Sequence, residues 1–122
     1  MRPSAIDRML AEARAQIVRY TPAEASAAGD DVLLVDLRSI DERARTGVIP
    51  GSVHVPRSVL EWRADPTSDW HEPVLAGRRL VLVCAQGYSS SLAAASLVQL
   101  GVDVGDLDGG FEAWAAQGLP VE

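Results

Sequence analysis

The sequence predicts an α/β fold built on a mainly parallel sheet. Two uninterrupted apolar runs of strand length, "DVLLVDL" at 31–37 and "RRLVLVC" at 78–84, are typical of strands buried on both faces. Helical patterns separate the predicted strands, and this alternation along the chain favours a parallel sheet covered by helices. The length, 122 residues, suits one domain.

Residues 4–20 are predicted to form one amphipathic helix, and residues 1–20 an N-terminal extension ahead of a domain at 21–122. Ser4 is a suitable N-cap, with Asp7 three positions on. The apolar stripe consists of Ile6, Met9, Leu10, Ala13 and Ile17. Such a stripe docks the helix on the domain or, alternatively, offers a surface to a partner or a second copy.

The first half of the domain is predicted to begin with a helix. Thr21 caps it, Pro22 takes its first position, and it ends at Gly29. The apolar strand of 31–37 follows. A short helix and turn are expected over 38–47, and a short strand within "IPGSVHVP" at 49–56, which prolines bound on both sides.

The second half starts with an irregular region at 57–77, which carries Trp62 and Trp70. These tryptophans either cover the edge of the core or cap the loop after Cys84. The apolar strand of 78–84 follows, then a helix over 89–101. A short strand is expected within 102–110, and a last helix over 110–118 that contains Trp114.

Composition excludes several classes of function. With 17 acidic and 11 basic residues, the net charge is −6, which argues against broad binding of nucleic acids or anionic membranes. No apolar segment approaches the ~20 residues that span a bilayer. One cysteine makes no internal disulfide, and the N-terminus does not resemble a secretory signal, so we expect a cytoplasmic protein. The two histidines are far apart and predict no metal site.

The single cysteine, Cys84, stands where a strand turns into a helix. The residues after it, "AQGYSS" at 85–90, include Gly87, which lets a loop curl tightly. Such a loop directs several backbone N–H groups to one point and, with the helix dipole, favours an anion there. An unperturbed thiol has a pKa of about 8.5, and these effects would bring it close to neutral pH, where a thiol attacks best.

The position of Cys84 is also compatible with two further roles. A lone cysteine after an apolar strand is often an inert core residue. A thiolate at this position is also suited to peroxide sensing, although without a second cysteine it would need an external thiol to resolve the sulfenic acid.

Three segments of the sequence resemble the single-domain rhodaneses, a family of sulfurtransferases. The first, "VDLRSIDERARTGVIPGSVHVP", resembles the family's Asp-x-Arg signature through Asp36, Arg38, Glu42 and 47–51. The second, "LVLVCAQGYSSSLAA", resembles the active-site loop. The third, "LDGGFEAWAAQGLPV", resembles the closing segment. Together they cover about residues 21–122.

The resemblance implies a three-layer rhodanese-like fold with a five-stranded, mainly parallel sheet flanked by helices. It implies that Cys84 takes a sulfane sulfur from a persulfide or thiosulfate donor, and that a thiol or cyanide acceptor removes it. A protein persulfide is a further candidate partner, and no cofactor is expected. The implied substrate-binding residues are Arg38, Ala85, Gln86, Gly87, Tyr88, Ser89 and Ser90.

The alternatives within this resemblance depend on individual residues. Arg38 would hold an anionic donor or form a structural pair with Asp36 or Glu42. Ala85 and Gln86 are neutral, which predicts weak thiosulfate:cyanide activity and favours a persulfide donor. Phosphatases of this fold need an arginine at position 90, where this chain has Ser90. A non-catalytic binding or sulfur-sensing module remains the alternative function, and the sequence leaves the oligomeric state open.

Overall fold

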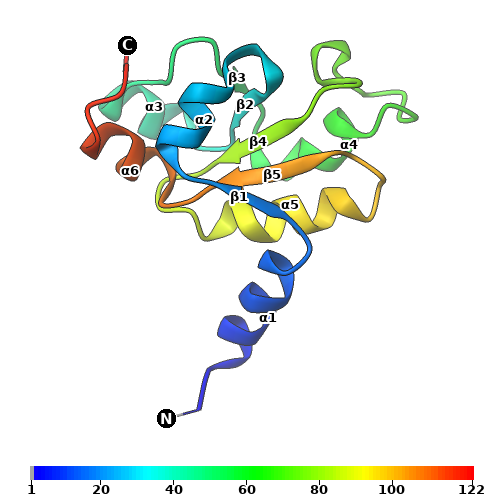
Figure 1. The fold of residues 1–122 in the computed structure, drawn as a ribbon. Coiled ribbons are helices and arrows are strands. Elements are labelled where there is room, and N and C mark those ends of the chain that lie inside the picture. The colour runs from blue at the N-terminus through cyan, green and yellow to red at the C-terminus, as the bar shows by residue number, and fades with distance from the viewer. Residues whose placement is uncertain (1) are drawn as a thin grey trace.

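The computed structural model describes residues 2–122, which form one five-stranded sheet in which all paired strands are parallel (Figure 1). The strands are β1 (Val18–Tyr20), β2 (Leu33–Asp36), β3 (Val53–His54), β4 (Leu80–Val83) and β5 (Val104–Leu107). The helices of this part of the chain are α1 (Ala5–Arg14), α2 (Pro22–Ala28), α3 (Ile40–Thr46), α4 (Leu60–Ala64), α5 (Ser89–Val98) and α6 (Gly110–Ala116). The predicted fold class is confirmed.

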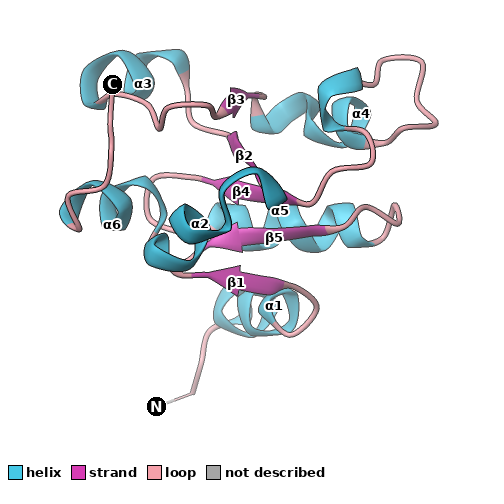
Figure 2. Ribbon diagram, turned by 45° about the horizontal axis from the view of Figure 1, so that its top comes forward, coloured by secondary structure: helices cyan, strands magenta, loops and turns pink. Residues whose placement is uncertain are grey.

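The strand order β1-β5-β4-β2-β3 places β4 in the middle of the sheet. The strands are short and lie nearly in register, with Asp36 of β2 opposite Val83 of β4. The carboxyl ends of the parallel strands therefore meet at one edge, as Figure 2 shows. In open α/β sheets this edge is where sites form, and Cys84 directly follows β4 there.

Two apolar cores lie on the two faces of the sheet. Alternate residues of β4 divide between them, because successive side chains of a strand point to opposite faces. Leu80 and Leu82 pack with α4 and α5, while Val81 and Val83 pack with α2 and α6. The sheet is thus the middle of three layers, and α1 lies beside α5 (Figure 1).

The N-terminal segment differs from the helix predicted over 4–20. The capped start is as expected, since Ser4 accepts a hydrogen bond from the Asp7 N–H, but α1 ends at Arg14. Residues 18–20 form the edge strand β1 and pair with β5, with Val18 opposite Gly105. The helical prediction was wrong there because a non-local strand partner outweighs the local helical period. Met1, the first residue of the predicted extension, lies outside the described residues.

The predicted helix starts depend on local capping. Thr21 and Glu24 form a reciprocal capping box at the start of α2, with Pro22 in the first turn. Ser39 caps α3 by accepting the Glu42 N–H at 3.1 Å. These caps fix where the chain leaves the sheet edge and returns, and so they position the loops around Cys84.

The longest helices of the described chain are α1 and α5, with 10 residues each. Across residues 2–122, no helix is both long enough and apolar enough to cross a membrane.

Candidate active site

The Cys84 sulfur lies inside the loop that joins β4 to α5. Its Sγ accepts hydrogen bonds from the backbone N–H of Gly87 at 3.1 Å and of Ser90 at 3.3 Å. The residue is 7% exposed, so it is packed like a core side chain on one side. The two N–H donors nevertheless give it polar partners, which an inert core cysteine does not need.

The loop takes this shape because Gly87 has a φ of +84°. A side chain there would also collide with the start of α6, since an added Cβ would lie 2.7 Å from the Gly109 nitrogen. Gly110 is equally close to the loop, where an added Cβ would lie 2.7 Å from the Ala85 carbonyl carbon. The two glycines of "LDGG" thus let α6 press its first turn against the loop.

The first turn of α6 holds two carbonyl groups of the loop. The Phe111 N–H donates to the Cys84 carbonyl at 2.8 Å, and the Glu112 N–H donates to the Ala85 carbonyl at 3.0 Å. In a planar trans peptide the next N–H points opposite to the carbonyl. The N–H groups of Ala85 and Gln86 therefore face away from α6.

Several loop N–H groups have no acceptor in the part of the chain that the structure describes. They belong to Ala85, Gln86, Tyr88 and Ser89. With the donors from Gly87 and Ser90, they form a ring of amides at the N-terminus of α5, which spans 10 residues. This arrangement is suited to an anionic sulfur, since it combines oriented amides with the positive end of a helix.

The electrostatics of Cys84 favour the thiolate. Burial works to raise the pKa of Cys84. Hydrogen bonds from the hydroxyls of Ser90 and Ser89 and from the N–H groups of Ser90 and Gly87 outweigh it, so the pKa lies below its ordinary value. The Ser90 hydroxyl also donates to Asp106 at 2.8 Å, and it has one proton to give. The backbone N–H groups are therefore the constant donors to the sulfur.

A buried charged network lies under the loop and was missed in the sequence. Asp106 of β5, fully buried, accepts hydrogen bonds from Ser90, Ser91 and Arg19. Arg14 and Arg19 both donate to the Gly87 carbonyl. The residues come from α1, β1, β5 and α5, at separations of 15 to 87 positions. No local spacing brings them together, so the sequence carried no signal for this network.

Arg38 lies at the end of β2 with its guanidinium engaged. It donates to both carboxylate oxygens of Asp36, at 3.1 and 2.9 Å, to the Thr46 hydroxyl at 2.7 Å and to the Gly47 carbonyl at 2.8 Å. It stacks on the Phe111 ring at 3.8 Å, and its side chain is 2% exposed. This geometry favours the structural pair with Asp36 over a role in holding a donor.

Trp62, Trp70 and Tyr88 lie on the surface, and His54 is partly buried. Trp62 and Trp70 are exposed, and Trp62 lines a hollow near the C-terminal end of α5, away from the Cys84 loop. His54 contacts the Arg38 carbonyl at 2.7 Å, as a satisfied strand histidine would. Tyr88 is 59% exposed on the loop.

A cavity of about 400 Å³ opens where the carboxyl ends of β2 and β3 meet. Leu37 and Ile40 contribute apolar surface to it, with His54 and Arg57 at its polar side. The Leu37 N–H donates to the carbonyl of Val83, the residue before Cys84. None of the residues that line this cavity belongs to the loop of 84–90.

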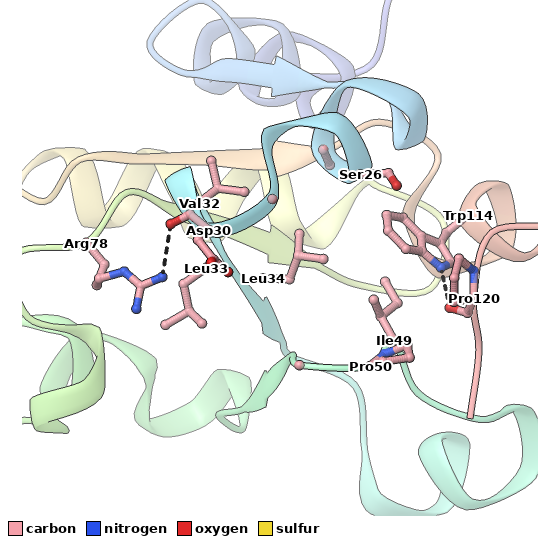
Figure 3. A pocket seen from close by; sticks show the side chains of 13 residues that line it. Ser26, Asp30, Val32, Leu33, Leu34, Ile49, Pro50, Arg78, Trp114 and Pro120 are labelled. Carbon is pink, nitrogen blue, oxygen red and sulfur yellow. Dashed lines mark hydrogen bonds between the residues drawn. The ribbon is translucent and has the colours of Figure 1, made fainter.

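A second cavity, of about 290 Å³, lies between α2 and the end of the chain (Figure 3). Figure 3 shows Trp114 and Ile49 toward one end and Asp30 with Arg78 toward the other. None of its lining residues belongs to the loop of 84–90. Over residues 2–122 there is also no group of three or more His, Cys, Asp or Glu side chains suited to a metal ion.

Comparison with known proteins agrees with these features. Residues 21–117 match the model of the rhodanese-like domain. A sulfurtransferase from Allochromatium vinosum is 37% identical over 93 residues, which are 75% of this chain and 79% of that protein. The thiosulfate sulfurtransferase GlpE from Pseudomonas savastanoi is 38% identical over 101 residues, covering 80% and 87% of the two chains.

Solved structures include two close neighbours of the whole fold. A protein of unknown function from Rhodopseudomonas palustris, described as a possible tyrosine phosphatase, has a TM-score of 0.91 and 37% identity, and the match covers 100% of this chain and 97% of that one. A rhodanese-related protein from Thermoplasma volcanium has a TM-score of 0.72 and 27% identity, over 85% and 96% of the two chains. The chain therefore belongs to the rhodanese-like family, as its three motifs predicted, and its place among the sulfurtransferases is confirmed.

Proposed function

We propose that this protein moves a sulfane sulfur from a donor to a nucleophilic acceptor through a persulfide on Cys84. The observation that supports it most is the ring of N–H groups around Sγ, two of which donate to it directly. The ring is the substrate-binding element in this proposal and consists of the backbone of 85–90. It favours the thiolate before transfer and the anionic persulfide after it.

The first half-reaction loads the enzyme. The Cys84 thiolate attacks the outer sulfur of a hydropersulfide anion or of thiosulfate. A new S–S bond forms at Cys84 while the S–S bond of the donor breaks, and the donor leaves as a thiolate or as sulfite with the bonding electron pair. The terminal sulfur on Cys84 then carries the negative charge within reach of the unpaired amides of Ala85, Gln86 and Tyr88.

The second half-reaction regenerates the Cys84 thiolate. A thiolate or cyanide acceptor attacks the terminal sulfur, the S–S bond at Cys84 breaks, and its electron pair restores the Cys84 thiolate. No net oxidation or reduction of the protein occurs over the cycle.

The choice of donor follows from the charges near the ring. Ala85 and Gln86 are neutral, and the guanidinium groups of Arg14 and Arg19 are bound to the Gly87 carbonyl. Thiosulfate, a dianion, thus finds no free cation on the loop, which supports a persulfide donor and weak thiosulfate:cyanide turnover. The Pseudomonas relative is named a thiosulfate sulfurtransferase, and efficient turnover of this protein at low millimolar thiosulfate would contradict this choice.

Intact-mass measurement after exposure to a panel of donors tests the proposal. Thiosulfate, polysulfide, cysteine persulfide and glutathione persulfide are each added to the wild type and to Cys84→Ser. We expect the wild type to gain about 32 Da, one sulfur, and to lose it on addition of a thiol or cyanide. Cys84→Ser should gain nothing. No adduct from any donor would favour a non-catalytic binding module.

Phosphoryl transfer is the second candidate, because the Rhodopseudomonas relative is described as a possible tyrosine phosphatase. A phosphatase loop needs a guanidinium to hold the transferred oxygens. Position 90 is a serine here, fully buried and bonded to Asp106. We therefore expect the wild type to hydrolyse p-nitrophenyl phosphate no faster than Cys84→Ser does. Faster hydrolysis by the wild type would support phosphoryl transfer.

A further inference from the structure

We propose that Arg14 and Arg19, which lie outside the loop, are positioning residues that lock the Gly87–Tyr88 peptide so that its N–H stays unpaired within the ring of amides and available to an anionic sulfur. The inference rests on the proposed function, because it concerns the same ring of amides. It assigns part of the sulfur site to α1 and β1, two elements that the loop motif does not include.

The Gly87 carbonyl accepts hydrogen bonds from two side chains. Arg14 donates through Nη2 at 2.8 Å and Arg19 through Nη2 at 2.9 Å. The Ser91 hydroxyl lies 3.3 Å away, but its one proton goes to Asp106 at 2.7 Å. Both donors to the carbonyl are charged, and charge-assisted bonds are roughly twice as strong as neutral ones. The Gly87 carbonyl is thus the most firmly held carbonyl of the loop.

The direction of this carbonyl decides the direction of an amide. The peptide is planar, so the Tyr88 N–H points opposite to the Gly87 carbonyl and away from the two arginines. Among residues 2–122 this N–H has no acceptor. Donation to the carbonyl also polarises the peptide and makes its N–H a better donor. The arginines therefore orient and strengthen the Tyr88 amide for an anionic sulfur.

Arg19 is fixed by the buried carboxylate of Asp106. Its Nε lies 2.9 Å from Asp106 Oδ1, and its Nη2 lies 3.3 Å from Oδ2. Partial burial works to lower the pKa of Arg19, but the hydrogen bond and charge of Asp106, with the charges of Asp108 and Cys84, raise it above its ordinary value. The guanidinium also offsets the Asp106 charge, which would otherwise repel a thiolate at Cys84.

Arg14 is fixed from α1. Its Nε donates to the Ser91 hydroxyl at 3.1 Å, and its guanidinium lies 5.5 Å from the centre of the Tyr88 ring. It has no carboxylate partner in the described chain, so removing it leaves no buried charge unpaired. Arg14 is therefore the cleaner of the two positions for a test.

The test measures the reactivity of Cys84 toward iodoacetamide as a function of pH. Arg14→Gln removes the charge and the donors to Gly87 and Ser91. We expect its apparent thiol pKa to rise and its alkylation rate at pH 7 to fall about threefold. The matched control is Arg8→Gln on the same helix, because Arg8 donates only to the Pro3 carbonyl and is exposed. It should keep the wild-type profile.

The variant Arg14→Lys distinguishes the effect of the positive charge from the effect of the hydrogen-bond geometry of the guanidinium. A lysine keeps the charge but lacks the planar fork that reaches Gly87 and Ser91 together, so its profile should lie closer to Arg14→Gln than to the wild type. A wild-type profile for Arg14→Gln, with its fold verified by circular dichroism, would overturn the inference. Iodoacetamide reacts with any thiolate, so this outcome is distinguishable from a protein that forms no persulfide with any donor.

Discussion

Two buried aspartates at the same end of the sheet, Asp36 and Asp106, each pair with an arginine, but only one pair reaches the sulfur site. Arg38 bonds to Asp36 and then to Thr46 and Gly47, so it ties β2 to the end of α3. Arg19 bonds to Asp106 and then to the Gly87 carbonyl. An Asp–Arg ion pair thus stabilises the fold at Asp36, and at Asp106 it holds the Cys84 loop.

The difference lies in where the remaining donors of each guanidinium go. The Arg38 side chain is 2% exposed and its bonds end on structural groups, whereas the Arg19 side chain is 21% exposed and its last bond ends on the loop. A buried ion pair by itself says little about function or stability. The group that receives the remaining hydrogen bonds of the arginine shows which part of the molecule the ion pair holds in place. For Arg38 this is the end of α3, and for Arg19 it is the Cys84 loop.

The largest expected effect comes from removing each arginine in turn. Arg38→Met leaves Asp36 with the backbone N–H of position 38, at 3.0 Å, and the contact to Arg43, at 3.2 Å, so we expect a loss of about 3–5 kcal/mol in the free energy of unfolding. Arg19→Met should lose less, about 1–3 kcal/mol, because water reaches that pair more easily. Only Arg19→Met should slow alkylation of Cys84 in the folded protein. Urea denaturation and iodoacetamide kinetics measure the two effects.

Equal slowing of Cys84 in both variants would remove the distinction between the two pairs. It would return Arg38 to the substrate-binding role that the sequence left open. Where Arg38→Met is too unstable to study, Arg38→Lys keeps a charge beside Asp36 and serves for the reactivity measurement.

The sequence predicted the local parts of this structure well. The capping residues at Thr21 and the apolar run of β4 depend on neighbours in the chain, and both were found where expected. The position of Cys84 at the strand-to-helix turn follows from the same local pattern. The resemblance to the rhodanese Asp-x-Arg signature singled out Asp36 and Arg38, which pair in the structure.

The sequence failed where a partner is distant. Val18–Tyr20 continues the helical period of α1, yet it is a strand because β5 offers an edge and Gly105 leaves room for the Val18 carbonyl. Arg19 and Asp106 are 87 positions apart, and Arg14 and Gly87 are 73 apart. The β-branched and aromatic residues in "VRY" were the one available sign of a strand. Nothing comparable marked the arginines.

A smaller effect on the free energy of unfolding is expected when the pH is lowered, because Asp36 becomes protonated. Burial works to raise the pKa of Asp36, but the hydrogen bonds and charge of Arg38, with the charge of Arg43, hold it below its ordinary value. A carboxylate with a lowered pKa stabilises the folded state above its ordinary pKa, and this contribution is lost as the pH falls through the folded value. Unfolding free energies measured at decreasing pH should therefore drop more steeply in the wild type than in Asp36→Asn. Parallel curves for the two proteins would mean that Arg38 does not lower the pKa of the Asp36 carboxyl.

The smallest effect links Cys84 itself to stability. Its lowered pKa means that the thiolate adds stability as the pH rises from the folded pKa to the ordinary one, and this gain is absent below the folded value. The stability difference between the wild type and Cys84→Ser should grow as the pH rises toward the ordinary thiol pKa of about 8.5 and level off above it. Arg14→Gln should flatten this growth, because it loosens the amides that hold the thiolate.

Arg43→Gln is the matched control for that measurement, on the Asp36 side of the comparison. Its half-buried contact to Asp36, at 3.2 Å, should contribute less than about 1 kcal/mol, and its loss should leave the alkaline slope unchanged. If Arg43→Gln flattened the slope as much as Arg14→Gln, the loss of any positive charge would be enough to reduce the contribution of the thiolate to stability. The thiolate would then respond to the overall field of the protein, and the orientation of the Gly87–Tyr88 peptide would not matter.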